Sequence, residues 1–168
     1  MKWLKRFRHT RGYGVHSPFA FRFITECLRE RLAYYAYDSF TGIEQCLAFR
    51  LAVFFQPEKI KSMSKDADKL ARAAKRGCPA ALHEDAPAVA AFEGKCRQLS
   101  IIGPAGAVDG EEFNDGDAVL VVANPPAVQA MCDRLDALGF GMAFIDADSG
   151  VFAIFRPLPR QTFYPRLY

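Results

Sequence analysis

The sequence has 168 residues, of which 51% are hydrophobic and 24% are charged, and its formal net charge at pH 7 is +3. This length allows one well-buried core and is short for two independent domains, and a charge so near zero argues against a protein that wraps nucleic acid. The sequence contains no run of about 20 apolar residues, so we expect no membrane-spanning helix.

Cysteine usage and the N-terminal residues indicate a reducing compartment. The five cysteines are widely spaced and none lies in a Cys-x-x-Cys pair, which is typical of small core residues and argues against a disulfide framework or a zinc site. The first eight residues lack the apolar stretch of a signal peptide. We therefore expect a cytoplasmic protein that holds no metal.

The chain begins with a basic arm, in which five cationic side chains have no acidic residue among them: Lys2, Lys5, Arg6, Arg8 and Arg11. Such a run is typical of a solvated surface, and the alternative is a contact with RNA or with an acidic partner.

Two helices are expected after this arm. Ser17 followed by Pro18 is a helix-start signal, and apolar residues then repeat at helical spacing as far as Leu32. The segment from Thr41 to Glu44 has the pattern of a capping box, in which the hydroxyl and the carboxylate each bond to the other residue's backbone N–H. Pro57 ends this second helix.

From residue 57 onwards, short strands alternate with helices. We predict strands over residues 58–63, 80–83, 99–102 and 117–123, the last apolar enough to be buried on both faces. Helices are predicted over residues 67–76, over residues 85–97, and between the N-cap Asn124 and the closing Gly139. Residues 141–145 and 151–155 then form a hairpin, which we expect at an antiparallel edge of the sheet.

This order predicts an α/β protein with a Rossmann-like three-layer fold, whose mostly parallel sheet carries an antiparallel C-terminal hairpin. Residues 1–56 are expected to form the basic arm and a helical extension packed on the core. Residues 57–168 are expected to form the Rossmann-like domain, and the whole chain one globular unit. Residues 102–106 contain two glycines but lack the Lys-Ser/Thr pair of a phosphate-binding loop, so we expect a turn there.

Motifs near both ends carry a resemblance to a known family. Gly14-Val-His-Ser-Pro-Phe19 follows the basic arm, and Tyr34-Tyr-Ala-Tyr37 follows the first helix. Near the C-terminus are Gly150-Val-Phe-Ala-Ile-Phe-Arg-Pro157 and Arg160-Gln161. With these motifs the chain resembles a bacterial family with an N-terminal GVHSPF-type motif that is related to class I S-adenosylmethionine (SAM)-dependent methyltransferases. The resemblance implies SAM as the candidate cofactor, and this chain looks shortened within that family.

The resemblance places the SAM site after the first strand, where glycines let the backbone approach the ligand. Residues 60–67 contain no glycine. In this segment, the resemblance implies Met63 and Ser64 as the cofactor contacts. After the second predicted strand, Glu84 matches the carboxylate that binds the ribose hydroxyls, with Asp85 beside it. The alternative is that Asp85 is an N-cap and Glu84 a solvated neighbour.

Asn124 and His16 are the candidate catalytic residues. Asn124-Pro-Pro resembles the turn of amino-methyltransferases, except that Ala127 replaces the aromatic residue; the alternative is a plain N-cap. His16 either orders the loop before the first helix or lies over the cofactor cleft as part of a lid. In the family, acidic and histidine side chains follow the strand that corresponds to residues 117–123. They are missing after that strand here, which gives little support to a metal-dependent reaction.

Three functions remain open. The missing glycines and the missing aromatic residue favour a methyltransferase-like protein with a degenerate SAM site, non-catalytic or weakly binding, that serves as a binding or structural module. The first alternative is an active SAM-dependent methyltransferase acting on a small molecule or a nucleic-acid base. The second is a protein that binds another adenosine-containing ligand through Glu84.

Overall fold

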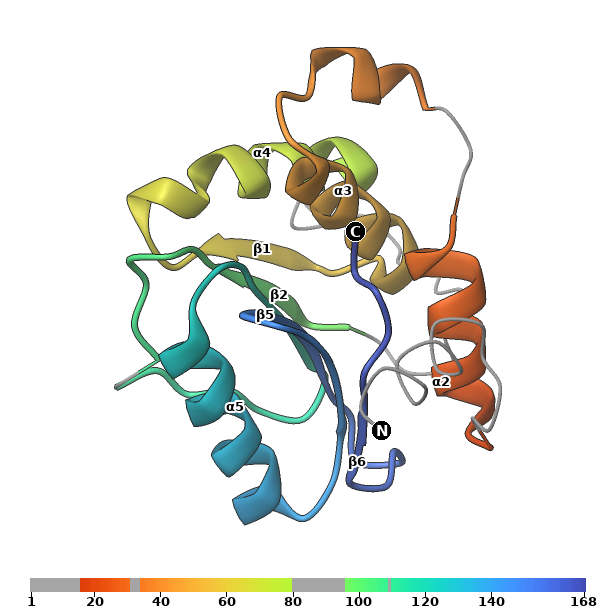
Figure 1. Ribbon diagram of the computed structural model, residues 1–168, viewed down its shortest axis with the longest axis vertical. Coiled ribbons are helices and arrows are strands. Elements are labelled where there is room, and N and C mark those ends of the chain that lie inside the picture. The colour runs from red at the N-terminus through yellow and green to blue at the C-terminus, as the bar shows by residue number, and fades with distance from the viewer. Residues whose placement is uncertain (1–15, 31–33, 80–95, 109) are drawn as a thin grey trace.

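The computed structural model describes residues 16–30, 34–79, 96–108 and 110–168. Its centre is a six-stranded sheet in the order β1-β2-β3-β5-β4-β6 (Figure 1). The strands are β1 (Lys59–Ser62), β2 (Gln98–Ile102), β3 (Asp117–Val121), β4 (Met142–Asp146), β5 (Ser149–Ile154) and β6 (Gln161–Phe163). Every pair is parallel except those of β5, which runs antiparallel to β3 and β4. The predicted α/β class and mostly parallel sheet are confirmed, and they are consistent with a Rossmann-like fold.

The C-terminal hairpin is confirmed, but its expected place at an edge of the sheet is wrong. Strand β5 lies inside the sheet between β3 and β4, and β6, which was not predicted, forms the edge beside β4. The chain returns to this edge because the Gly141 N–H donates to Leu158 O at 2.9 Å and the Gln161 N–H donates to Gly141 O at 3.2 Å. These contacts join residues far apart in sequence, so local patterns do not reveal them.

Helices cover both faces of the sheet. Helices α2 (Pro18–Arg22), α3 (Ile43–Phe55) and α4 (Asp68–Gly77) pack on one face, and α5 (Pro125–Leu138) packs on the other (Figure 1). Alternate residues of β3 point to opposite faces: Leu120 joins the core under α3 and α4, whereas Val121 joins the core under α5. All five residues of β3 are buried, as the sequence predicted.

The first helix begins as expected and changes its winding within two turns. The Ala20 N–H donates to Ser17 Oγ at 3.3 Å, which confirms the predicted N-cap. After α2 the helix continues as the π-helix η1 (Phe23–Leu28), and Arg29 and Glu30 are no longer helical, so the predicted extension towards Leu32 is wrong. Buried aromatic rings place this helix against the sheet, because the rings of Phe23 and Phe144 are only 4.4 Å apart between centroids.

A 3-10 helix, η2 (Tyr35–Ser39), precedes α3, and the cap of α3 differs from the prediction in both of its residues. Gly42 is the N-cap, and the Gln45 side chain, not that of Glu44, reaches back to accept from the Thr41 N–H at 2.7 Å. The predicted box of Thr41 and Glu44 is therefore wrong: glycine has no side chain to cap with, and only the half supplied by Gln45 is present, one position later. The other boundaries from residue 57 onwards agree closely with the sequence prediction, apart from residues 80–95, which lie outside the described part.

Within the described part, no helix combines the length and apolar character that crossing a bilayer would require.

Candidate functional site

The carboxyl ends of β1, β2 and β3 meet at one edge of the sheet, because these neighbouring strands are parallel. In open α/β sheets this edge is where ligands bind. Three segments leave it: residues 63–67 after β1, residues 103–106 after β2, and residues 122–124 after β3. Met63, Ser64 and Asn124 are therefore brought to the same edge. This strand-end edge is the candidate functional site.

The segment after β1 is fixed by short-range and cross-strand hydrogen bonds. The Met63 N–H donates to Ile101 O at 2.9 Å, which extends the pairing of β1 with β2. Ser62 Oγ donates to Ser64 O at 2.8 Å and closes a tight turn. The 3-10 helix η3 (Lys65–Ala67) then leads into α4. A hydrogen-bonded turn without glycine thus occupies the position of the expected cofactor loop.

Asp66 ties this turn to the segment that follows β2. Its Oδ2 accepts from the Ala105 N–H at 2.9 Å, and Ser64 Oγ accepts from the Gly103 N–H at 3.3 Å. The approach is close enough that a Cβ on Gly103 would lie 2.5 Å from Asp66 Oδ2, so a side chain there would displace the Asp66 carboxylate. The Ser64 hydroxyl, and then the Ala105 N–H, hold the pKa of Asp66 below its ordinary value because they favour the charged form.

Asn124 binds the same segment from the other side. Its Oδ1 accepts from the Ala127 N–H at 3.1 Å, which confirms the predicted N-cap of α5. Its Nδ2 donates to Gly103 O at 2.9 Å and to Gly106 O at 2.8 Å, and the side chain is buried. The functional groups of this amide are therefore bonded within the chain. Residues 103–106 form a turn, as expected, that is held between β1 and α5.

The hairpin of β4 and β5 fixes the backbone just before Asn124. Ala123 has a φ of 48°, which costs a non-glycine residue about 1–2 kcal/mol. The Ala123 N–H donates to Ser149 Oγ at 3.0 Å, and the Asn124 N–H donates to Asp148 O at 2.8 Å. These bonds offset the strain and aim the Asn124 side chain into the sheet edge.

The structure does not bring His16 to this site. The next residue, Ser17, contacts Met142 with its Oγ 3.9 Å from the sulfur. Met142 begins β4, and the register places it level with the start of β3. Asn124 follows the carboxyl end of β3, so the two residues lie at opposite ends of the strands. His16 itself is exposed. The position of this residue gives no support to a lid over the strand ends.

The remaining sequence candidates lie outside the described residues. These are Glu84 and Asp85, together with the basic arm of Lys2, Lys5, Arg6, Arg8 and Arg11. Among the residues that the structure does describe, no group of three or more His, Cys, Asp or Glu side chains could hold a metal ion. The five cysteines are all free thiols.

The described residues of the strand-end edge do not fit SAM. A bound nucleoside needs bare backbone and free hydrogen-bonding groups, whereas Asp66, Ser64 and Asn124 already bind residues 103–106. Two carboxylates, Asp66 and Asp68, also lie beside the start of α4 and oppose the approach of an anionic group to this helix terminus.

Sequence reasoning missed the part played by Asp66 and by residues 103–106. A signal was present, since both follow predicted strands and parallel strands end at one edge. It could be used only once β1 and β2 were known to be neighbours.

Comparisons of the chain with protein-family models, with curated proteins and with solved structures find no match.

Proposed function

We propose that this chain is a methyltransferase-like protein with a degenerate SAM site, and that it acts as a non-catalytic or weakly binding module. The observation that supports the proposal is the network in which Asp66 and Asn124 bind residues 103–106 across the strand-end edge. The polar groups that a nucleoside would use are engaged by the chain itself. The edge therefore supports a structural role better than a cofactor site.

The cost of opening this edge gives the expected loss of affinity. A ligand that displaced residues 103–106 would break four hydrogen bonds: one from Ala105 to Asp66, one from Gly103 to Ser64, and two from Asn124 to the glycine carbonyls. At about 0.5–1.5 kcal/mol net for each bond, the total is roughly 2–6 kcal/mol. Since about 1.4 kcal/mol is tenfold in affinity, SAM should bind at least about 30-fold more weakly than at an open site.

A thermal-shift titration with SAM and S-adenosylhomocysteine, checked by calorimetry, tests the proposal. A ligand at about 100 times its Kd adds about 2.7 kcal/mol, which raises Tm by roughly 5–11 °C in a domain of this size. We expect no shift at micromolar ligand and at most a weak one at millimolar ligand. Saturation at micromolar ligand, or methyl transfer from SAM to any substrate, would refute the degenerate site. In that case Glu84→Ala should abolish the shift if Glu84 holds the ribose.

We further propose that the partner of this module is RNA or an acidic protein held by the basic arm. The support is the sequence of the arm, whose five cations have no acidic residue among them. Reversing Arg6 and Arg8 to glutamate should weaken capture of such a partner at physiological salt. Capture equal to that by the unaltered chain would refute this role of the arm.

A further inference from the structure

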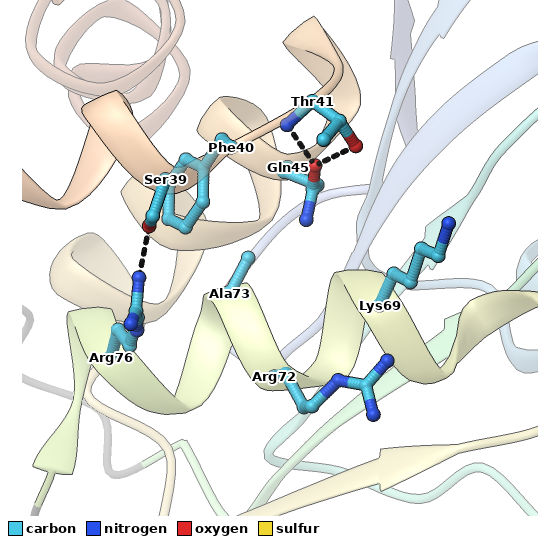
Figure 2. A pocket seen from close by; sticks show the side chains of 8 residues that line it. All are labelled: Ser39, Phe40, Thr41, Gln45, Lys69, Arg72, Ala73 and Arg76. Atoms are coloured by element: carbon cyan, nitrogen blue, oxygen red, sulfur yellow. Dashed lines mark hydrogen bonds between the residues drawn. The ribbon is translucent and has the colours of Figure 1, made fainter.

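A groove of about 330 Å³ lies between the start of α3 and the outer side of α4 (Figure 2). Its volume is at the lower end of the range for small-ligand sites, about 300–1,000 Å³. One wall is basic and comes from α4, whereas the other carries hydroxyl and amide groups from η2 and the start of α3. The residues that give these walls their polar groups are Lys69, Arg72, Arg76, Ser39, Thr41 and Gln45.

The basic wall consists of three cations on one face of α4. Lys69, Arg72 and Arg76 follow a spacing of three and four residues, which places them side by side along a helix. Arg76 Nη1 donates to Ser39 Oγ across the groove. Within the described part of the chain, Lys69 and Arg72 form no ion pair, and no acidic side chain lines the groove. The groove therefore concentrates positive charge that the described residues do not neutralise.

The opposite wall contributes a donor with a fixed direction. Gln45 Oε1 accepts from the Thr41 N–H at 2.7 Å, from Thr41 Oγ1 at 3.0 Å and from the Gly42 N–H at 3.2 Å. These bonds fix the amide plane and turn its Nε2 away from the cap. Figure 2 shows Nε2 directed towards α4, on the side of Ala73. The groove thus presents an N–H donor on one side and three cations on the other.

We propose that this groove binds a phosphate group, carried by a small phosphorylated molecule or by the backbone of single-stranded RNA. Guanidinium and ammonium groups on one side and an amide donor on the other suit an anion with several acceptor oxygens. The oxygens of a phosphate group are arranged tetrahedrally and can face both walls, whereas the two oxygens of a carboxylate lie in one plane and suit this arrangement less well. The proposal uses no residue of the strand-end edge and does not depend on the proposed function.

Calorimetric titrations of the full chain with inorganic pyrophosphate and with a six-residue oligouridylate test the proposal. The sharpest variant is Gln45→Glu, which keeps an acceptor oxygen for Thr41 and Gly42 and replaces the inward donor by a carboxylate oxygen. A carboxylate near the start of a helix is favourable for folding, so Tm should not fall. A second variant, Lys69→Glu/Arg72→Glu, reverses the basic wall. The matched control is Lys59→Glu, an exposed lysine of β1 outside the groove.

We expect both groove variants to weaken pyrophosphate binding about tenfold or more, since a charge-assisted hydrogen bond is worth roughly 1.5–3 kcal/mol. Lys59→Glu should change the affinity less than about twofold, and added salt should weaken binding to the unaltered chain. If the oligouridylate binds more tightly than pyrophosphate and loses affinity in the groove variants, the phosphate source is nucleic acid. If it does not, the source is a small molecule.

Three results would overturn the proposal. The first is no saturable heat with pyrophosphate or with the oligouridylate at low salt. The second is binding that Gln45→Glu and Lys69→Glu/Arg72→Glu leave unchanged while Tm shows that both variants are folded. The third is oligouridylate binding that is lost only when Arg6 and Arg8 are reversed, together with no binding of pyrophosphate, which would place the only contact in the basic arm.

Discussion

Replacing Asn124 tests whether its amide holds the strand-end edge together. The side chain is 5% exposed and makes three hydrogen bonds: one from the Ala127 N–H, and two to the carbonyls of Gly103 and Gly106. In Asn124→Ala all three bonds are lost, and the buried carbonyl of Gly103 loses this donor. The loss should therefore exceed that of an ordinary N-cap.

The magnitude follows from these contacts. Loss of an N-cap side chain costs about 1 kcal/mol, and loss of the two further bonds costs about 1 kcal/mol each. The free energy of unfolding should thus fall by roughly 3 kcal/mol, and Tm by about 6–12 °C for a chain of this length. Gln129→Ala is the control, because Gln129 is exposed on the same helix and bonds only to Asp133 in the described part. Its effect should stay within about 0.5 kcal/mol.

The variant Asn124→Asp separates the cap from the contacts with the turn. Aspartate caps helices as well as asparagine does, and its charge suits a helix start. It cannot donate to Gly103 O and Gly106 O, however, and it places a carboxylate oxygen against them. We expect a loss of about 2 kcal/mol or more, measured by guanidinium unfolding at pH 7. If Asn124→Asp proves as stable as the unaltered chain, Asn124 is only a cap and the reasoning about the closed edge fails.

Two further predictions concern packing and pH. In Gly77→Ala, the new Cβ would lie 2.4 Å from Phe49 O in α3. The free energy of unfolding should therefore fall by about 1–3 kcal/mol, although alanine favours helices more than glycine does. A variant that is more stable in guanidinium unfolding would refute the close approach. Burial raises the pKa of Cys27 and Cys96 to about 12, so the folded state holds protons that the unfolded state releases above about pH 8.5. Stability should therefore fall as pH rises from about 8.5 towards 12, by up to about 1.4 kcal/mol per pH unit for each thiol. Unfolding midpoints at pH 8 and pH 10 measure this fall, and Cys27→Ala should remove part of it; an unchanged slope in that variant would contradict the assignment.

The sequence determined the elements that depend on neighbouring residues. The cap at Ser17, the start of α5 at Asn124 and its end at Gly139 were all predicted, because a cap is decided by a side chain and the backbone within one helical turn. The continuous apolar run of β3 likewise indicated a strand buried on both faces. These signals were sufficient for the α/β class and for the order of the described elements along the chain.

Only the tertiary structure decided where strands lie in the sheet and which groups meet at its edge. The insertion of β5 between β3 and β4 depends on pairing across the sheet, which leaves no signal in a single strand. The amide of Asn124 reaches carbonyls 18 and 21 residues away, and Asp66 reaches an N–H 39 residues away. The helical spacing of the basic residues Lys69, Arg72 and Arg76 could be seen in the sequence. The polar wall on the other side of the groove exists only because α3 packs beside α4. The two helices pack together because both bury their apolar faces on the same side of the sheet, which is a long-range effect.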